Sequence, residues 1–144
     1  MQTFQFHLHK VLEWYDNQRQ NEERQLTTSI AALTEVQEAL DRLDAERLEI
    51  ARQLISRSII LARDLAALGL YRLGAKKHEL ELVAERERRE VVVREQRIKV
   101  QAAQRRVRLL DKLRERQQTE HNYAMERELE KMVSDAYMSK WPSR

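Results

Sequence analysis

Leucine recurs every seven residues through the first half of the chain. Counting from residue 12, seven of nine positions hold leucine and two hold arginine: Leu12, Arg19, Leu26, Leu33, Leu40, Arg47, Leu54, Leu61 and Leu68. A companion series offset by three residues is apolar in its middle, at Val36, Leu43 and Ile50. This spacing, kept over so many heptads, predicts a long α-helix that pairs with another helix in a left-handed supercoil.

The second half has a less regular apolar pattern, nearer the 3.6-residue period of a straight helix. Its stripe is Leu80, Ala84, Val91, Ile98, Ala102, Leu109 and Leu113, and after a shift it continues as Met125, Leu129, Met132 and Ala136. We interpret this stripe as the pairing face of a second amphipathic helix.

The helix-breaking residues are few and lie near the middle and the end of the chain. The only glycines are Gly69 and Gly74, and the only proline is Pro142. Glycine costs about 1 kcal/mol and proline about 3 kcal/mol in a helix interior. We therefore predict an all-α fold, a single antiparallel two-helix coiled coil (a helical hairpin) over residues 1–144. Its helices span 4–66 and 76–138 and its tip spans 67–75. The alternative is a parallel dimer of one continuous helix, which the glycines disfavour.

The charge distribution is consistent with this hairpin. Charged residues make up 35% of the chain, which is typical of coiled coils. Disorder is the competing interpretation of such polarity, and the leucine series argues against it. Residues 86–116 carry 12 basic and 5 acidic side chains, whereas residues 26–56 carry 3 and 6. A fold that is symmetric about residue 71 places these two segments side by side.

Few residues suggest chemistry. The chain has no cysteine, which excludes disulfides, thiolate catalysis and cysteine-bound zinc. The histidines, His7, His9, His78 and His121, lack the spacing of a chelating pair, and we interpret them as solvated. Because a hairpin offers no convergent cleft, we predict a protein that is not an enzyme, with no catalytic residues, no metal and no cofactor.

Nucleic-acid and membrane binding are also disfavoured. The basic stretch 86–116 has acidic residues interleaved, and no aromatic residue lies between Tyr71 and Tyr123. The apolar cluster 58–73 is interrupted by three charged residues and is too short for a transmembrane segment. The N-terminus lacks the pattern of a secretory signal. We expect a soluble protein that acts by contact with other proteins.

Three local patterns together resemble the FliJ family, the cytoplasmic stalk proteins of flagellar protein export. The first is Phe4-x-Phe6-x-Leu8-x-x-Val11-Leu12, followed by Glu22 and Glu23. The second is Leu109-Leu110-Asp111-Lys112-Leu113-Arg114-Glu115-Arg116, followed by Tyr123. The third is the acidic ending Glu126-x-Glu128-x-Glu130-Lys131-Met132-Val133-Ser134-Asp135-Ala136. The family usually has an apolar-Asp-Glu run where this chain has Val133-Ser134-Asp135. It is also related to the YscO-type stalks of injectisomes.

The resemblance implies an antiparallel hairpin similar to the coiled coil of the rotary ATPase gamma subunit. Its implied partners are a hexameric export ATPase, whose ring it enters, the cytoplasmic domain of the membrane export gate, and in some cases export chaperones. It implies a cytoplasmic protein, peripheral at the cytoplasmic side of the cell membrane. The alternatives are an injectisome stalk, a structural coiled coil, or a chaperone-binding adaptor without ATPase coupling.

Two groups of residues are candidates for partner binding. Residues 59–74 hold more apolar side chains than one seam can bury, so either the connection folds over them or they meet a partner. By analogy with the gamma subunit, the end with both termini enters the ATPase ring and the tip meets the gate. The candidates at the tip are Ile59, Ile60, Leu70, Tyr71 and Leu73. The candidates along the shaft are Arg105, Arg106 and Arg108, which we expect to face acidic groups of the ring. The alternative interpretation is that these three arginines are solvated.

Overall fold

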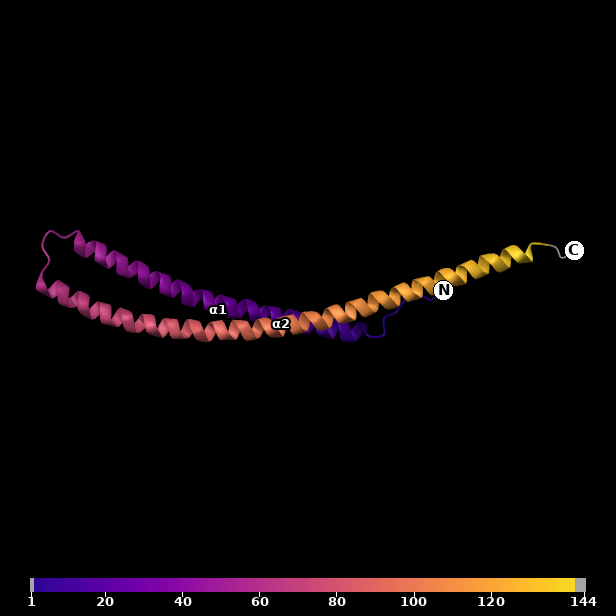
Figure 1. Cartoon of the computed structure of the whole chain (residues 1–144), viewed down its shortest axis with the longest axis horizontal. Helices are drawn as coiled ribbons and strands as arrows, with labels where there is room; N and C mark the ends of the chain where they lie inside the picture. Colours follow the sequence, from indigo (N-terminus) through magenta and orange to yellow (C-terminus); the bar gives the residue numbers. More distant parts are fainter. Residues whose placement is uncertain (1, 142–144) are drawn as a thin grey trace. The chain divides into compact units, whose positions relative to one another are not determined.

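The computed structural model describes residues 2–141 of the chain, and the described part contains two α-helices and no strand. Helix α1 spans His9–Ile55 and helix α2 spans Ala62–Ser139. The helices pack against each other in opposite directions (Figure 1). The predicted all-α helical hairpin is confirmed.

The predicted position of the turn is wrong. The connection covers residues 56–61, not 67–75, and α1 begins at His9 rather than near residue 4. The predicted end of the second helix, residue 138, lies one residue from the observed end at Ser139. Gly69 and Gly74 lie inside α2, neither has a positive φ, and each faces open space. Both glycines therefore only lower the stability of a helix that continues through them.

Local hydrogen bonds place the turn at residues 56–61. At the end of α1, the Ser56 hydroxyl donates to the Gln53 carbonyl at 2.8 Å. At the start of α2, the Asp64 carboxylate accepts the Leu61 backbone N–H at 3.4 Å, which is the contact that the N3 acid makes in a capping box. Arg57 and Asp64 form an ion pair at 3.4 Å across the connection. A carboxylate in the first turn also interacts favourably with the helix dipole, so Asp64 indicates that a helix begins here. The two glycines indicated a later turn and drew attention away from this residue.

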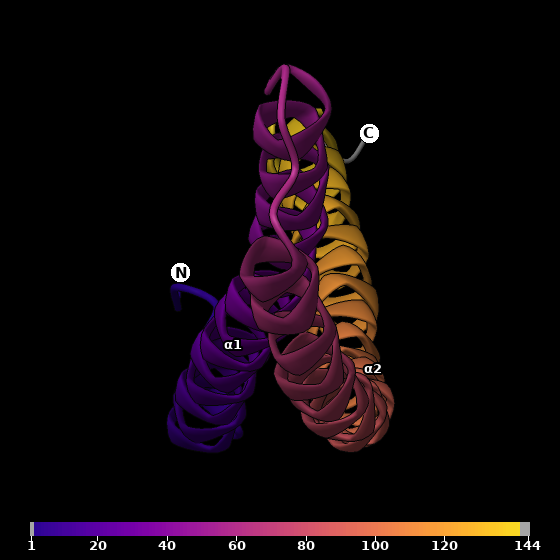
Figure 2. The same ribbon diagram turned by 90° about the vertical axis from the view of Figure 1, so that its left-hand side faces the viewer.

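The chain divides into two compact units. The turn unit comprises residues 21–100 and contains the connection between the helices. The end unit comprises residues 1–20 and 101–144. In the turn unit, α1 and α2 are joined by the connection and lie side by side, as both views show (Figures 1 and 2).

The α1 face of the turn unit is the one predicted. Every residue of the leucine series from Leu26 to Leu54, and of its companion from Ser29 to Ile50, is buried or half-buried. Leu43 is only 7% exposed, whereas Leu48, which belongs to neither series, is 64% exposed. We call these inward-facing residues of each helix its seam.

The α2 face is not the one predicted. Leu80, Val91 and Ile98 of the expected stripe are exposed, whereas Ala75, Val93 and Val100 are buried. The seam of α2 in this unit follows a spacing of three and four residues, broken once between Arg86 and Val93, and some of its members are polar: Leu68, Tyr71, Ala75, Glu79, Leu82, Arg86, Val93, Gln96 and Val100. In a sequence, long polar side chains are usually interpreted as surface residues. Their aliphatic stems can nevertheless cover an apolar seam.

Polar contacts between the helices show the register of the turn unit. Gln96, 6% exposed, donates from Nε2 to the Glu22 carbonyl at 3.0 Å and also to the Glu22 carboxylate. Arg47 donates from Nη2 to Glu79 Oε2 at 3.0 Å. A fold symmetric about residue 71 would instead place Gln96 beside residue 46. The predicted pairing of residues 86–116 with 26–56 is therefore wrong, because the turn lies earlier in the chain.

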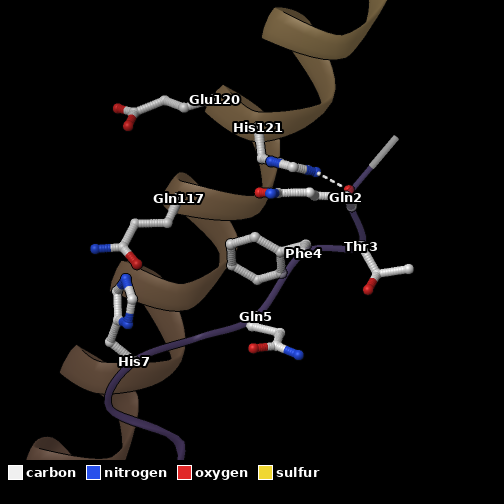
Figure 3. A pocket seen from close by; sticks show the side chains of 8 residues that line it. All are labelled: Gln2, Thr3, Phe4, Gln5, His7, Gln117, Glu120 and His121. Atoms are coloured by element: carbon white, nitrogen blue, oxygen red, sulfur yellow. Dashed lines mark hydrogen bonds between the residues drawn. The ribbon is translucent and has the colours of Figure 1, made fainter.

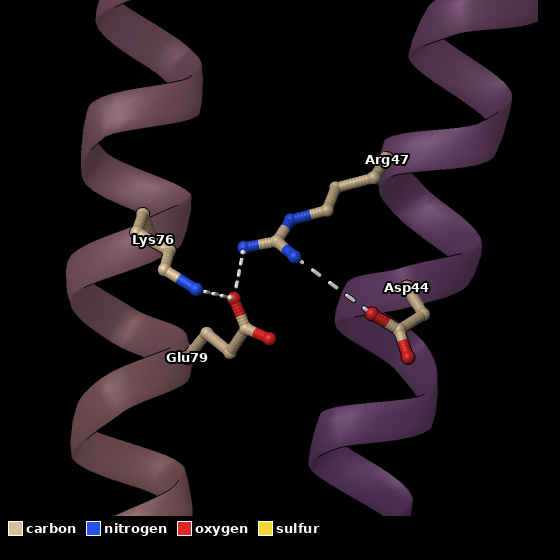
Figure 4. Close-up of polar contacts among 4 residues, drawn as sticks. All are labelled: Asp44, Arg47, Lys76 and Glu79. Carbon is tan, nitrogen blue, oxygen red and sulfur yellow. Dashed lines mark hydrogen bonds and ion pairs between the residues drawn. The ribbon is translucent and has the colours of Figure 1, made fainter.

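Glu79 is the centre of a small charge network (Figure 4). Lys76 approaches the same carboxylate oxygen at 3.3 Å, and Asp44 lies 3.9 Å from the Arg47 Nη1. Hydrogen bonds from Arg47 and then from Lys76 lower the pKa of Glu79. Because these side chains are partly exposed, their ion pairs add little to the stability of the fold. We infer that their main effect is to fix the register of α1 against α2.

Candidate partner-binding surfaces

Four of the five predicted tip residues are exposed. Ile59 and Ile60 lie in the connection, at 73% and 47% exposure, and Leu70 and Leu73 lie on α2 at 73% and 70%. The structure thus leaves uncovered the apolar surplus that the sequence contains at this end. Large side chains in such positions are typical of an interaction surface.

Tyr71 is the exception, because it belongs to the seam. Its side chain is half-buried, and its hydroxyl is buried without a hydrogen-bond partner among the described residues. Burial raises the pKa of Tyr71, and the nearby Glu46 carboxylate raises it further. A side chain enclosed in this way supports the hairpin itself, and its predicted role in partner binding stays a prediction.

The sequence interpretation missed part of this surface. Ile55 is 81% exposed at the last residue of α1, and Leu61 and Leu65 are exposed at the start of α2. Leu61 was assigned to the leucine series, but the helix has ended before it. The exposed apolar residues around the connection form what we call the turn patch: Ile55, Ile59, Ile60, Leu61 and Leu65.

A second apolar surface is the stripe of α2 that was expected to pair with α1. In the turn unit it faces away from the seam, and its members there are Leu80, Ala84, Val91 and Ile98, all exposed. We call it the outer stripe. Its helical spacing is as regular as that of the true seam, which explains the wrong assignment.

The predicted arginines lie on α2 in the end unit, and all three are exposed. The Arg106 guanidinium lies 6.0 Å from the centre of the Tyr15 ring, within the range of a cation–π contact. Arg106 therefore helps to hold α1 against α2 in this unit. Within residues 2–141, Arg105 and Arg108 form no ion pair or cation–π contact, so their charges are available to a partner.

The end unit also contains an open, polar hollow of about 860 Å³ between the N-terminal segment and α2 (Figure 3). Its lining includes Phe4, Gln117 and His121. The Phe4 and His121 rings lie 5.7 Å apart, and His121 Nε2 lies 3.2 Å from the Gln2 carbonyl oxygen. His121 is half-buried in the seam, so its assignment as a solvated residue is wrong.

The described residues that line this hollow do not form a metal-binding set. Within residues 2–141, the structure contains no group of three or more His, Cys, Asp or Glu side chains that could hold a metal. The His121 imidazole, which lines the hollow, already contacts the backbone carbonyl of Gln2. None of the described helices is long and apolar enough to cross a membrane.

Comparison with sequence models of protein families, with curated proteins and with solved structures finds no match to this chain.

Proposed function

We propose that this chain is a non-catalytic stalk or adaptor of a flagellar or related type III protein-export apparatus. In this role it enters the ring of the hexameric export ATPase and couples that ATPase to the cytoplasmic domain of the membrane export gate. It is then cytoplasmic and peripheral at the cytoplasmic side of the cell membrane. It needs no cofactor and binds no nucleic acid.

One observation carries this proposal: two antiparallel helices expose an apolar patch at the turn that joins them. Hairpin geometry supports a role in which one end of the helix pair is held while the other contacts a second protein. The turn patch is suited to the gate contact, since Ile59 is 73% exposed and Ile55 is 81% exposed. Arg105 and Arg108 in the end unit are suited to acidic groups of an ATPase ring.

The stalk role is tested by adding the purified chain to the cognate export ATPase. We expect hexamer formation and ATP hydrolysis to increase with the amount of chain added. Replacing Arg105 and Arg108 by Gln should reduce this stimulation, because the matching charges in the ring lose their partners. Hydrolysis and assembly that do not respond to the chain would contradict the stalk role and leave the adaptor role, with an export chaperone as the partner.

The gate contact is tested separately, by calorimetric titration of the gate's cytoplasmic domain. The double variant Ile59→Ser/Ile60→Ser should bind at least about tenfold more weakly, because two apolar anchors are lost. Ile98→Ser on the outer stripe is the matched control, since Ile98 is also exposed, at 66%. Equal losses in both variants, or none in either, would remove the turn patch from the gate contact.

A further inference from the structure

The seam of α2 continues beyond the part of the helix that the rest of the chain covers. In the end unit its buried or half-buried members are Ala103, Val107, Leu110, Arg114, Gln117, His121 and Met125. Steps of three and four residues lead from Met125 to Leu129, Met132 and Ala136. Leu129, Met132, Val133 and Ala136 therefore share the helix face that α1 covers at Val107, and we call these four residues the C-terminal face.

The part of α2 that other segments of the chain cover ends at Met125. Leu12 and Val107 line one hollow, so α1 still covers the seam there. Further along, the N-terminal segment takes over, and Gln2 lines a hollow with Met125 and Glu128. From residue 126 to residue 141 every residue is exposed. The C-terminal face thus continues the seam of α2, and the covered part of that seam ends one turn earlier, at Met125.

The charges beside the C-terminal face are mostly acidic. Glu126, Glu128 and Asp135 lie next to it in the helical projection, against a single base, Lys140. In paired helices the flanking charges select the partner and its orientation. Acidic flanks favour a partner helix with lysine or arginine beside its apolar stripe.

We propose that the C-terminal face binds an amphipathic α-helix of a partner protein, with basic residues flanking its apolar stripe. The partner helix extends the α1–α2 interface by packing on the continuation of the same seam. Leu129 and Met132 fill the centre of this contact, and Leu129 is already 42% and Met132 62% exposed to receive it. This binding site goes beyond the export role and does not depend on it.

Two other occupants fit the charges less well. A second copy of this chain on the same face would bring Glu126, Glu128 and Asp135 close to their own counterparts, and like charges at flanking positions are destabilising. An anionic membrane would be repelled by the same acids.

The test uses two designed helical peptides and the full chain. Both peptides carry leucine and isoleucine at the seam positions of three heptads; one has lysine at the flanking positions and the other glutamate. Fluorescence anisotropy should show that the lysine peptide binds at least about tenfold more tightly than the glutamate peptide. The double variant Leu129→Ser/Met132→Ser should lose at least about tenfold in affinity for the lysine peptide.

Met138→Ser is the matched control, because Met138 is 70% exposed on the opposite side of the same helix end. It should change the affinity less than about twofold. The double change Glu128→Lys/Asp135→Lys should reverse the preference between the two peptides. Circular dichroism should show the same helix content in all variants, since the replaced side chains are exposed.

Three results would overturn the proposal. The first is binding of the lysine peptide that Leu129→Ser/Met132→Ser leaves unchanged, which means nonspecific attraction. The second is a concentration-dependent dimer in sedimentation that the same variant dissociates, which makes a second copy the occupant. The third is binding to vesicles of phosphatidylserine and phosphatidylcholine that the variant abolishes, which makes a lipid surface the occupant.

Discussion

The two helices of the turn unit differ in how many apolar faces they carry. Helix α1 has one regular stripe, and its residues from Leu26 to Leu54 are those that the structure buries or half-buries. Helix α2 has two, the partly polar seam around Val93 and Gln96 and the exposed outer stripe around Val91 and Ile98. A helix with one stripe has one face to bury, whereas a helix with two can pair through either. The buried face of such a helix depends on its partner.

The largest expected contrast lies between two leucines of α1. Leu43→Ala should destabilise the chain by about 2–3 kcal/mol, because it opens a cavity in the seam. Leu48→Ala should cost less than about 0.5 kcal/mol, because Leu48 is 64% exposed. Urea unfolding followed by circular dichroism measures both. Similar costs for the two variants would mean that the seam of α1 is wrongly placed.

A smaller contrast is expected between two valines of α2, and it separates the seam from the outer stripe. Val93 is 5% exposed and Val91 is 42% exposed, although they lie two residues apart. Val93→Ala should cost about 1–2 kcal/mol, and Val91→Ala less than about 0.5 kcal/mol. The reverse order in urea unfolding would show that α2 pairs through the stripe that the sequence suggested.

The smallest effect concerns the glycines and has the opposite sign. Gly69→Ala and Gly74→Ala should each stabilise the chain by roughly 0.5–1 kcal/mol, because alanine loses less conformational freedom in a helix. Both sites have room for the added methyl group. Thermal unfolding of the single variants, with the unchanged chain as reference, measures the shift. Destabilisation by either variant would support a turn at residues 67–75 instead.

The predicted binding residues differ in their exposure, and their role in partner binding stays a prediction. Ile59, Ile60, Leu70 and Leu73 are exposed as the tip prediction requires, because the local sequence has more apolar residues than a seam can bury. Tyr71 could not be separated from them by sequence, since its half-burial in the seam depends on how α1 packs against α2. For the same reason the sequence did not indicate that Arg106 faces Tyr15.

By itself, the sequence determined the all-α class, the antiparallel pairing of two helices and the seam of α1. The helices and the seam of α1 follow from local spacing, that is, from the leucine series and the absence of prolines within the helices. The antiparallel pairing was expected from the two glycines, although both lie inside α2 and not at the turn. Only the tertiary structure decided the turn at residues 56–61, the seam of α2 and the register in which Gln96 meets Glu22. The physical reason is that a helix tolerates two glycines at about 1 kcal/mol each. That cost is small beside the burial of a whole seam, so the packing between α1 and α2 outweighs the local preference for a turn.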